Sequence, residues 1–356
     1  PGFRIYLSFF YLCQKFSQMK LHNKYSKEVL LARLQAESFR RRTVSFYRYV
    51  NFENPKEFRD QLYLALDSLS CLGRIYVAHE GINAQMNVPE HNIDAFLEYL
   101  QSVCELQDMP LKWAIEESKY SFIKLVVRVR PKIVADGLED GAFDVTNVGK
   151  HLSPVEFHEL SQKEDVVVVD MRNNYESEVG RFENAICPDA ETFREELEDV
   201  VETLADKKDK KILLYCTGGI RCEKASAWLK HHGFSDVNQL HGGIIAYVSE
   251  IRQKGLESRF IGKNFVFDER LGERVTDHVL GKCYQCGKPC DTHVNCRYDP
   301  CHELVIQCSE CAEKYGGCCS EECYTNMKSF PWHQKEYRKQ LNQLRPVIGE
   351  KREKAC

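Results

Sequence analysis

The stretch LLYCTGGIRCEKASAWL, residues 213–229, decides the fold of the central part of the chain. An apolar run ends at Tyr215, and Cys216 and a glycine-containing loop lead into a predicted helix that starts at Arg221. A continuous apolar run is typical of a strand that is covered on both faces of a parallel sheet. Ligands of such sheets bind beyond the carboxyl ends of the strands. The pattern therefore places Cys216 in a ligand-binding crevice.

The loop after this cysteine predicts an anion-binding site. It consists of Thr217, Gly218, Gly219, Ile220 and Arg221. Two glycines permit a tight turn with inward-pointing backbone N–H groups, and the helix N-terminus adds positive potential. An ionised thiol is such an anion, so we expect the pKa of Cys216 to fall below its reference of about 8.5. The resulting thiolate would be a nucleophile at neutral pH, whereas most buried cysteines only pack in a core.

Other interpretations of this loop are weaker or left open. A nucleotide-binding P-loop is excluded, because no Lys-Ser/Thr pair ends the loop. Cysteine-dependent phosphatases also pair a loop cysteine with an arginine, but only four residues separate Cys216 from Arg221 here, one fewer than in those enzymes. For Cys222, helix packing is the favoured interpretation. The alternative is a resolving thiol that pairs with an oxidised Cys216.

The neighbouring segments complete a parallel α/β unit. DVVVVDMR (165–172) and KKILLYC (210–216) read as strands, HLSPVEFHELSQ (151–162) as a helix, and VNQLHGGIIAY (237–247) as a strand with a glycine turn. Alternating strands and helices imply a parallel sheet, so we predict a domain over 145–255.

The N-terminal part, residues 19–140, predicts a ferredoxin-like α+β domain. Its pattern is a strand over 43–50, a helix over 55–69, two strands within 73–89 that turn near Glu80-Gly81, a helix over 91–103, and further strands in LKWAIEE and SFIKLVVRVRPKIVA. Strand–helix–strand–strand–helix–strand is the order of that fold. The whole chain is thus of the α/β class.

The remaining segment, 256–323, is a linker followed by a cysteine-rich module. CYQC (283–286) and CSEC (308–311) are separated by 21 residues, which predicts a structural zinc site made of Cys283, Cys286, Cys308 and Cys311. Further possible ligands for a second ion are Cys290, His293, Cys296, Cys301, His302, Cys318, Cys319 and Cys323. The alternative is a reduced cluster without metal, or a set of disulfides. Residues 324–356 form a basic tail.

Composition restricts the class of protein. The 356 residues carry a net charge of −4, with 43% hydrophobic and 29% charged residues, which is typical of a soluble globular protein with no overall attraction to polyanions. The apolar run over 5–13 is too short to span a bilayer and precedes no cleavage site. We therefore expect reduced cysteines and a cytoplasmic location without membrane partners. Because Met19 resembles a natural start, we expect residues 1–18 to be an upstream or non-native extension.

Residues 148–252 resemble a rhodanese domain. DMRNNYESEVGRF carries the Asp-x-Arg…Glu…Gly pattern of that family at Asp170, Arg172, Glu176 and Gly180, and LHGGIIAY carries its glycine turn. Arg181 stands where many rhodaneses have histidine. The resemblance implies that Cys216 is the persulfide-forming or otherwise catalytic cysteine, with Asp170, Arg172 and Glu176 in supporting roles.

From Met19 to about Cys323 the chain resembles the bacterial tRNA wobble-uridine hydroxylase family. The resemblance rests on SFYRYV, RIYVAHEGINAQ, KIVADG, DMRNNYE, YCTGGIRCEKASAW, GGII and RFIGKNFVFDER, which occur in this order before the cysteine-rich segment. It implies oxygen-dependent 5-hydroxylation of the wobble uridine in the tRNA anticodon, with molecular oxygen as co-substrate and the rhodanese cysteine required. The sequence has no dinucleotide or flavin fingerprint and no 2-His-1-carboxylate pattern. Either Cys216 adds to C6 of the uracil, or an oxidised sulfur on Cys216 delivers oxygen.

Two other function classes compete with the hydroxylase. The rhodanese unit alone would suit a sulfurtransferase that carries a cysteine persulfide, and the cysteine-rich module would suit a non-enzymatic zinc- and RNA-binding adaptor. Candidate RNA contacts are Lys124, Arg128, Arg130 and Lys132 on one strand face, Phe260, Phe265 and Phe267 in the segment 259–270, and His79 and Glu80 in the segment 78–85. For each of these, a solvated or packed structural role is about as plausible. The oligomeric state is left open.

Overall fold

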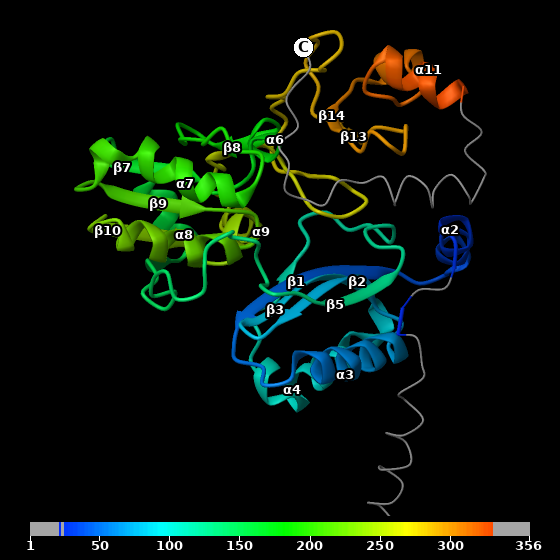
Figure 1. The fold of residues 1–356 in the computed structure, drawn as a ribbon, viewed down its shortest axis with the longest axis horizontal. Coiled ribbons are helices and arrows are strands. Elements are labelled where there is room, and N and C mark those ends of the chain that lie inside the picture. Colours follow the sequence, from blue (N-terminus) through cyan, green and yellow to red (C-terminus); the bar gives the residue numbers. More distant parts are fainter. Residues whose placement is uncertain (1–20, 23–24, 330–356) are drawn as a thin grey trace, which may run out of the picture. The chain divides into compact units, whose positions relative to one another are not determined.

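The computed structural model describes residues 21–22 and 25–329, which belong to two compact units, Pro1–Asp277 and His278–Cys356 (Figure 1). The expectation for residues 1–18, and that for the basic tail beyond residue 329, lie outside the described residues. The limits predicted for the domains within the chain stay predictions. Among the described helices, none is both long and apolar enough to span a membrane.

The described part of the first unit contains helix α2 (Lys27–Ala36) and, after it, a five-stranded sheet in the order β4-β1-β3-β2-β5. The strands are β1 (Arg41–Tyr49), β2 (Leu72–Ala78), β3 (Gly81–Pro89), β4 (Lys112–Trp113) and β5 (Leu125–Val129). The third strand lies antiparallel between the first two, and the fourth lies antiparallel to the first, which is the ferredoxin-like arrangement that the sequence predicts. Strand β5 extends the sheet parallel to β2.

Helices α3 (Pro55–Ser68) and α4 (Ile93–Ser102) lie on the same side of this sheet (Figure 1). Helix α3 begins where the pattern predicts, because Asn54 caps the N–H of Glu57 and Pro55 occupies the first turn. The buried faces of both helices pack on alternate side chains of the sheet in one hydrophobic core. Three short 3-10 turns lie at Glu90–Asn92, Cys104–Leu106 and Ala205–Lys207.

The central part of the unit is a parallel sheet in the order β6-β10-β9-β7. Its strands are β6 (Lys150–Leu152), β7 (Val166–Asp170), β9 (Lys211–Tyr215) and β10 (Asp236–Leu240), and its helices are α5 (Pro154–Leu160), α6 (Asn174–Ser177), α7 (Phe193–Thr203), α8 (Ile220–His231) and α9 (Gly243–Gln253). Ile212 and Leu214 enter one hydrophobic core and Leu213 and Tyr215 the other. The apolar run is thus covered on both faces, which confirms the parallel α/β prediction.

A small antiparallel sheet follows, in the order β12 (Glu273–Arg274), β11 (Phe260–Asn264) and β8 (Gly180–Phe182). Of the three phenylalanines considered as stacking platforms, Phe260 and Phe265 are buried, and only Phe267 is exposed. Packing therefore accounts for the first two.

The basic strand face predicted from Lys124, Arg128, Arg130 and Lys132 is wrong in part. Strand β5 runs from Leu125 to Val129, so Lys124 lies before it and Arg130 and Lys132 lie beyond it. The Lys132 ammonium also pairs with Asp136 at 2.9 Å and Asp140 at 3.2 Å. The backbone turns before the even-numbered alternation reaches Lys132, and intramolecular carboxylates neutralise it.

The second unit contains a hairpin of β13 (His293–Asn295) and β14 (Leu304–Ile306), followed by α10 (Ser309–Lys314) and α11 (Glu321–Ser329). Few large apolar side chains are buried in its described part, where Val305 and Ile306 are joined mainly by cysteines. This agrees with the cysteine-rich module that the sequence predicts.

Candidate active site

Cys216 lies between β9 and α8, where the parallel sheet ends and the helix begins. The N–H of Gly219 donates a hydrogen bond to the Cys216 sulfur over 3.1 Å. Gly219 has a φ of +99°, and a Cβ there would come within 2.9 Å of the Tyr47 hydroxyl oxygen. Only glycine fits this turn without strain, so the loop closes around the sulfur as the glycine pattern predicts.

The glycine turn of LHGGIIAY packs against the loop that follows Cys216. The N–H of Ile244 donates to the carbonyl oxygen of Cys216, and that of Ile245 to the carbonyl oxygen of Thr217, over 3.0 and 3.2 Å. Gly243 has a φ of +66°, and a Cβ there would lie 2.5 Å from the Cys216 carbonyl oxygen. The two loops therefore pack backbone against backbone.

Cys216 sits where an ionised thiol is favoured. Burial alone would raise the pKa of Cys216, but a hydrogen bond from the Cys222 thiol, the charge of Arg221 and the N–H groups at the start of α8 lower it to about 5. Cys216 is buried yet lines a cavity. At neutral pH the side chain is therefore a thiolate that faces a pocket.

Cys222 has the packing role that the sequence favours, and its sulfur also neighbours that of Cys216. Its side chain is fully buried in the hydrophobic core that also contains Cys216, which is the packing role. Its thiol also donates a hydrogen bond to the Cys216 sulfur, and burial together with that neighbouring thiolate raises the pKa of Cys222 well above its usual range. The two sulfurs are thus neighbours, one ionised and one protonated.

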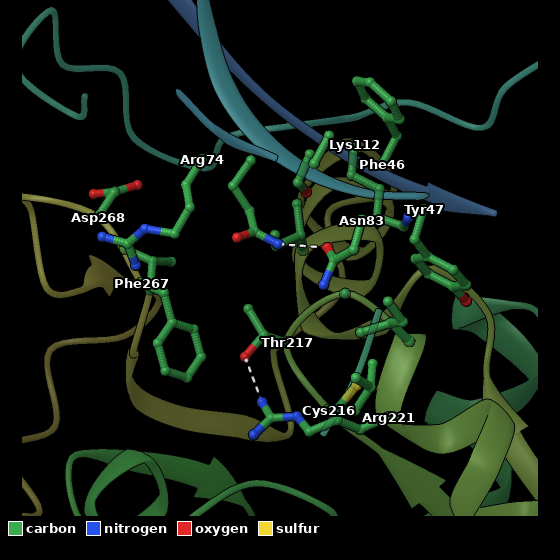
Figure 2. A pocket seen from close by; sticks show the side chains of 18 of the residues that line it. Phe46, Tyr47, Arg74, Asn83, Lys112, Cys216, Thr217, Arg221, Phe267 and Asp268 are labelled. Carbon is green, nitrogen blue, oxygen red and sulfur yellow. Dashed lines mark hydrogen bonds between the residues drawn. The ribbon is translucent and has the colours of Figure 1, made fainter. Parts of the chain in front are cut away.

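Arg221 is held by Glu176 in a bidentate ion pair, with N–O distances of 2.6 and 3.0 Å. The Thr217 hydroxyl lies 3.4 Å from the Arg221 guanidinium (Figure 2). It also lies 3.3 Å from a Glu176 carboxylate oxygen. The guanidinium also lies 5.9 Å from the ring centroid of Phe267. The fixed charge beside Cys216 is therefore positioned by a buried carboxylate.

Asp170 and Arg172 have a different place. They form a fully buried bidentate pair, with distances of 2.8 and 2.7 Å. Arg172 also donates to the carbonyl oxygen of Gly180, and the Tyr215 hydroxyl donates to Asp170. Neither charged side chain lines the cavity. The pair fixes the ends of β7 and β9, and so supports the loop without facing a ligand.

The cavity in front of Cys216 has a volume of about 430 Å³ (Figure 2). We call it the Cys216 pocket. One wall is the loop after β9; another comes from the N-terminal sheet; the segment after β11 closes a third side. Its side chains include Tyr47, Arg74, Tyr76, Asn83, Gln85, Lys112, Cys216, Thr217, Arg221, Phe267 and Asp268. The N-terminal sheet thus gives the loop a pocket with aromatic and amide walls.

The segment 78–85 contributes to this pocket through its second half. Asn83 and Gln85 line it, and the Gln85 amide donates to the Asn83 amide oxygen over 2.7 Å. Glu80 instead pairs with Lys224 at 2.9 Å, and His79 bonds the carbonyl oxygen of Phe52. Both His79 and Glu80 therefore make contacts within the protein, which agrees with the structural role considered for them as the alternative to RNA binding.

Lys112 and Tyr47 are two pocket residues that sequence reasoning missed. The Lys112 ammonium lies 4.4 Å from the ring centroid of Tyr47, whose hydroxyl donates to Glu223 over 3.0 Å. Strand β4 is only two residues long, so no alternation marks Lys112 as buried. The only available signal was a lysine within the apolar LKWAI.

The second unit contains two groups of four cysteines. The first cysteine cluster is Cys283, Cys286, Cys308 and Cys311; the second is Cys296, Cys301, Cys319 and Cys323. Within each, the sulfur atoms all lie within 4.8 Å of one another, and all eight cysteines are free thiols. The sulfur atoms of Cys286 and Cys308, of Cys301 and Cys319, and of Cys319 and Cys323 lie 3.5–3.6 Å apart. This is near the separation of about 3.8 Å that follows from Zn–S bonds of about 2.3 Å in a tetrahedron. The donor sets fit zinc.

The first cluster is the set that the sequence predicts for a metal. Four of the eight further candidate ligands form the second cluster in the structure. The other four, Cys290, His293, His302 and Cys318, lie outside both clusters. The Cys318 thiol instead contacts the Met327 sulfur at 3.7 Å.

Comparison with known proteins covers nearly the whole described chain. Three family models match it: the UPF0176 acylphosphatase like domain over residues 41–133, the Rhodanese-like domain over 153–250 and the Rhodanase C-terminal over 261–324. A protein of Leptospira interrogans is 58% identical over 339 residues, 93% of this chain and 92% of its own length. Proteins of Enterobacter and Escherichia coli are 52% identical over 304 residues, 85% of this chain and 87% of theirs. All three are named tRNA uridine(34) hydroxylase. At this identity and coverage, the chain belongs to the tRNA uridine(34) hydroxylase family.

Proposed function

We propose that this protein hydroxylates C5 of the wobble uridine, position 34, of tRNA with molecular oxygen, and that Cys216 is the reacting side chain. The observation that carries the proposal is family membership at 52–58% identity over at least 85% of the chain. The thiolate in the Cys216 pocket supplies the nucleophile that such a reaction needs.

The pocket suits a single pyrimidine base. A base that leaves the stack of the anticodon loop is commonly held by aromatic faces and read by polar groups at its edges. Tyr76 and Phe267 offer such faces, and Asn83 and Gln85 offer amide groups. Arg74 lines the same pocket and is exposed, so it can meet a phosphate at the entrance.

The proposed hydroxylation balances in atoms, electrons and protons. One oxygen atom of O2 replaces the hydrogen at C5 as a hydroxyl group, and the other leaves as water, which requires two electrons and two protons. In our proposal the Cys216 thiolate forms a bond to C6, so that the π pair of C5=C6 becomes available at C5 to bond oxygen. Elimination of Cys216 with the C5 proton then restores the double bond and leaves a hydroperoxide on C5. The freed Cys216 thiolate takes the outer peroxide oxygen and becomes a sulfenic acid, which leaves the hydroxyl group on C5. A second thiol displaces water from that sulfur to form a disulfide, so the two thiols supply the two electrons.

Cys222 is the thiol that we assign to this pair. It neighbours the Cys216 sulfur and does not line the pocket. A disulfide between the two can close without displacing substrate contacts, and a soluble thiol that enters the pocket can reopen it at Cys216.

The test of the reaction is nucleoside mass spectrometry of tRNA, from cells with and without the gene and from the purified protein incubated with tRNA in air. We expect 5-hydroxyuridine or its derivatives to disappear without the gene, and to form in vitro only with O2. Loss of thiolated nucleosides instead would support the sulfurtransferase alternative, which the low pKa of Cys216 also suits. A Cys216→Ala protein that restored the modification would overturn the role of the cysteine.

A covalent intermediate can be tested separately. We expect intact-protein mass spectrometry of the enzyme with tRNA that carries 5-fluorouridine at position 34 to show a Cys216-linked species in the absence of oxygen. An oxidised Cys216 that forms before tRNA is added would instead favour delivery of oxygen from sulfur.

We also propose that each cysteine cluster binds one zinc ion with a structural role. Metal analysis should find two zinc ions per chain, one for each cluster, and Cys301→Ser should leave one. The fully buried Cys318, which lies outside both clusters, gives the matched control: Cys318→Ser should keep both ions.

A further inference from the structure

Lys112 is a buried cation without a carboxylate partner. Among the described residues, the Lys and Arg side chains that are buried are Arg41, Lys112, Arg172, Arg221 and Lys224. The other four form ion pairs at 2.5–2.9 Å, with Glu37, Asp170, Glu176, and Glu80 and Asp136 respectively. Lys112 is 9% exposed and has neither an ion pair nor a hydrogen bond within the part of the chain that the structure describes. A desolvated, unpaired ammonium is costly, which makes a structural role a poor explanation.

The ammonium is held in place without a hydrogen bond or an ion pair to a described residue. The stem of Lys112 passes the two glycine loops, because a Cβ built on Gly218 would lie 3.9 Å from its Cδ and one built on Gly242 3.8 Å from its Cε. Its Nζ lies 4.4 Å from the ring centroid of Tyr47, a cation–π contact that retains all three N–H donors. Burial lowers the pKa of Lys112 to about 8, so the group is still mostly charged at neutral pH.

Lys112 and Cys216 line the same cavity but come from different domains (Figure 2). The lysine lies on β4, which pairs with β1 of the N-terminal sheet. Arg221, the other buried cation of the pocket, already forms an ion pair with Glu176. Lys112 is therefore the buried positive charge that a ligand in this pocket can recruit.

We propose that the Lys112 ammonium binds an exocyclic carbonyl oxygen of the substrate uracil and carries the negative charge that reaches this oxygen during the reaction. The inference rests on the proposed function. When the Cys216 sulfur bonds to C6, the π pair of C5=C6 shifts to C5 and is shared with O4 as an enolate. An N–H of Lys112 donates to that oxygen. The charge moves from sulfur to oxygen within the pocket, with no change in oxidation state.

Such a donor stabilises the intermediate more than bound substrate, because the carbonyl oxygen becomes anionic only after addition. Removing one donor of this kind typically lowers kcat by about 10²–10³-fold. The role therefore predicts a loss in kcat with little change in KM for tRNA.

The experiment compares Lys112→Met, Lys112→Arg and Arg74→Met in the full-length protein, with 5-hydroxyuridine formation measured at varied tRNA concentration. We expect Lys112→Met to lose about 10²-fold in kcat, and Lys112→Arg to recover part of it. Arg74→Met, an exposed pocket cation, should mainly raise KM and do so more at low salt. Lys112→Met should also slow formation of the adduct with 5-fluorouridine tRNA in the absence of oxygen.

A second readout separates this role from a structural one. The groups facing Lys112 are Tyr47 on β1, Cys216 in the loop, Glu223 on α8 and His241 before α9. Removing the ammonium should modestly raise the pKa of the Cys216 thiol, seen as a shift to higher pH in the rate of its alkylation. A folding defect alone would lower activity without that shift.

Three outcomes are distinguishable. If the wild-type protein forms no 5-hydroxyuridine, the proposed function fails. If it does, and Lys112→Met keeps its kcat and its rate of adduct formation, the inference about Lys112 is wrong. If Lys112→Met changes only KM, in parallel with Arg74→Met, the lysine merely attracts RNA and the proposal is again overturned.

Discussion

Cys216 and the cysteines of the His278–Cys356 unit carry the same side chain in different surroundings. Cys216 meets backbone N–H groups, an arginine and a single neighbouring thiol, and it faces a cavity of about 430 Å³. Each cluster cysteine meets three other thiols at no more than 4.8 Å. N–H donors with one open side stabilise a reactive anion, whereas four converging sulfurs can hold a metal ion and would then leave no position for substrate.

The largest effect is expected when the reactive thiol of this comparison, Cys216, is removed. Cys216→Ala should reduce 5-hydroxyuridine formation by at least about 10³-fold, as removal of a catalytic nucleophile typically does. Cys187→Ser is the matched control, because Cys187 lies in the same domain outside the pocket, and burial raises the pKa of its thiol to about 11. Nucleoside mass spectrometry measures both; equal losses in the two variants would contradict the assignment.

Removing one cysteine of a cluster should affect the folding of the His278–Cys356 unit rather than the hydroxylation reaction. Cys308→Ser removes one ligand of the first cluster, so we expect one zinc ion to be lost and the His278–Cys356 unit to unfold locally, because structural zinc contributes folding free energy directly. Metal analysis and hydrogen exchange of that unit report the change. Hydrogen exchange around β9 and α8 should stay as in the wild type, and a variant that keeps two zinc ions would disprove the predicted ligand set.

The pH dependence of alkylation sharpens the difference between a thiolate and an ordinary thiol. With a pKa of about 5, Cys216 is ionised above that pH, so its rate with iodoacetamide should be nearly constant from pH 6 to 8 and fall below pH 5. Arg221→Met removes a charge that favours the thiolate, so the plateau should move to higher pH; a rise of about one pKa unit would lower the rate about twofold at pH 6 and about fivefold at pH 5. Peptide mass spectrometry follows the site, and an unshifted profile would exclude Arg221 as a cause.

The smallest effect concerns the neighbouring thiol. Cys222→Ser should keep activity within about threefold when an external thiol is supplied, because a small polar side chain replaces a small buried one. Without external thiol, the wild type should complete one turnover and contain a Cys216–Cys222 disulfide, whereas the variant should not. If the variant completes that turnover equally well, Cys222 only packs in the core.

Much of this molecule follows from local pattern. The alternation and capping of β1, α3, β2 and β3 predict the ferredoxin-like order, and the apolar run before Cys216 predicts a strand covered on both faces. The two C-x-x-C pairs predict the first cluster, because a short loop brings both sulfurs of each pair to one point. The ligands of the second cluster were not predictable, since six cysteines and two histidines at irregular spacing allow many sets.

The basic strand face failed for a similar reason. Alternation holds only while the strand continues, and β5 ends before Arg130. Ion pairing of Lys132 with Asp136 and Asp140 depends on the path of the chain after the strand, which periodicity does not describe.

The sequence alone determined that Cys216 stands in an anion-binding loop, because the strand, the glycines and the helix start that create this environment are consecutive in the chain. Only the tertiary structure decided what faces the sulfur. Lys112 lies more than a hundred residues before Cys216 along the chain, and it enters the same pocket because the N-terminal sheet packs against the loop through contacts such as Tyr47–Glu223 and Lys224–Glu80. Local pattern fixes how a residue's own segment folds, whereas its distant neighbours depend on which surfaces are buried together.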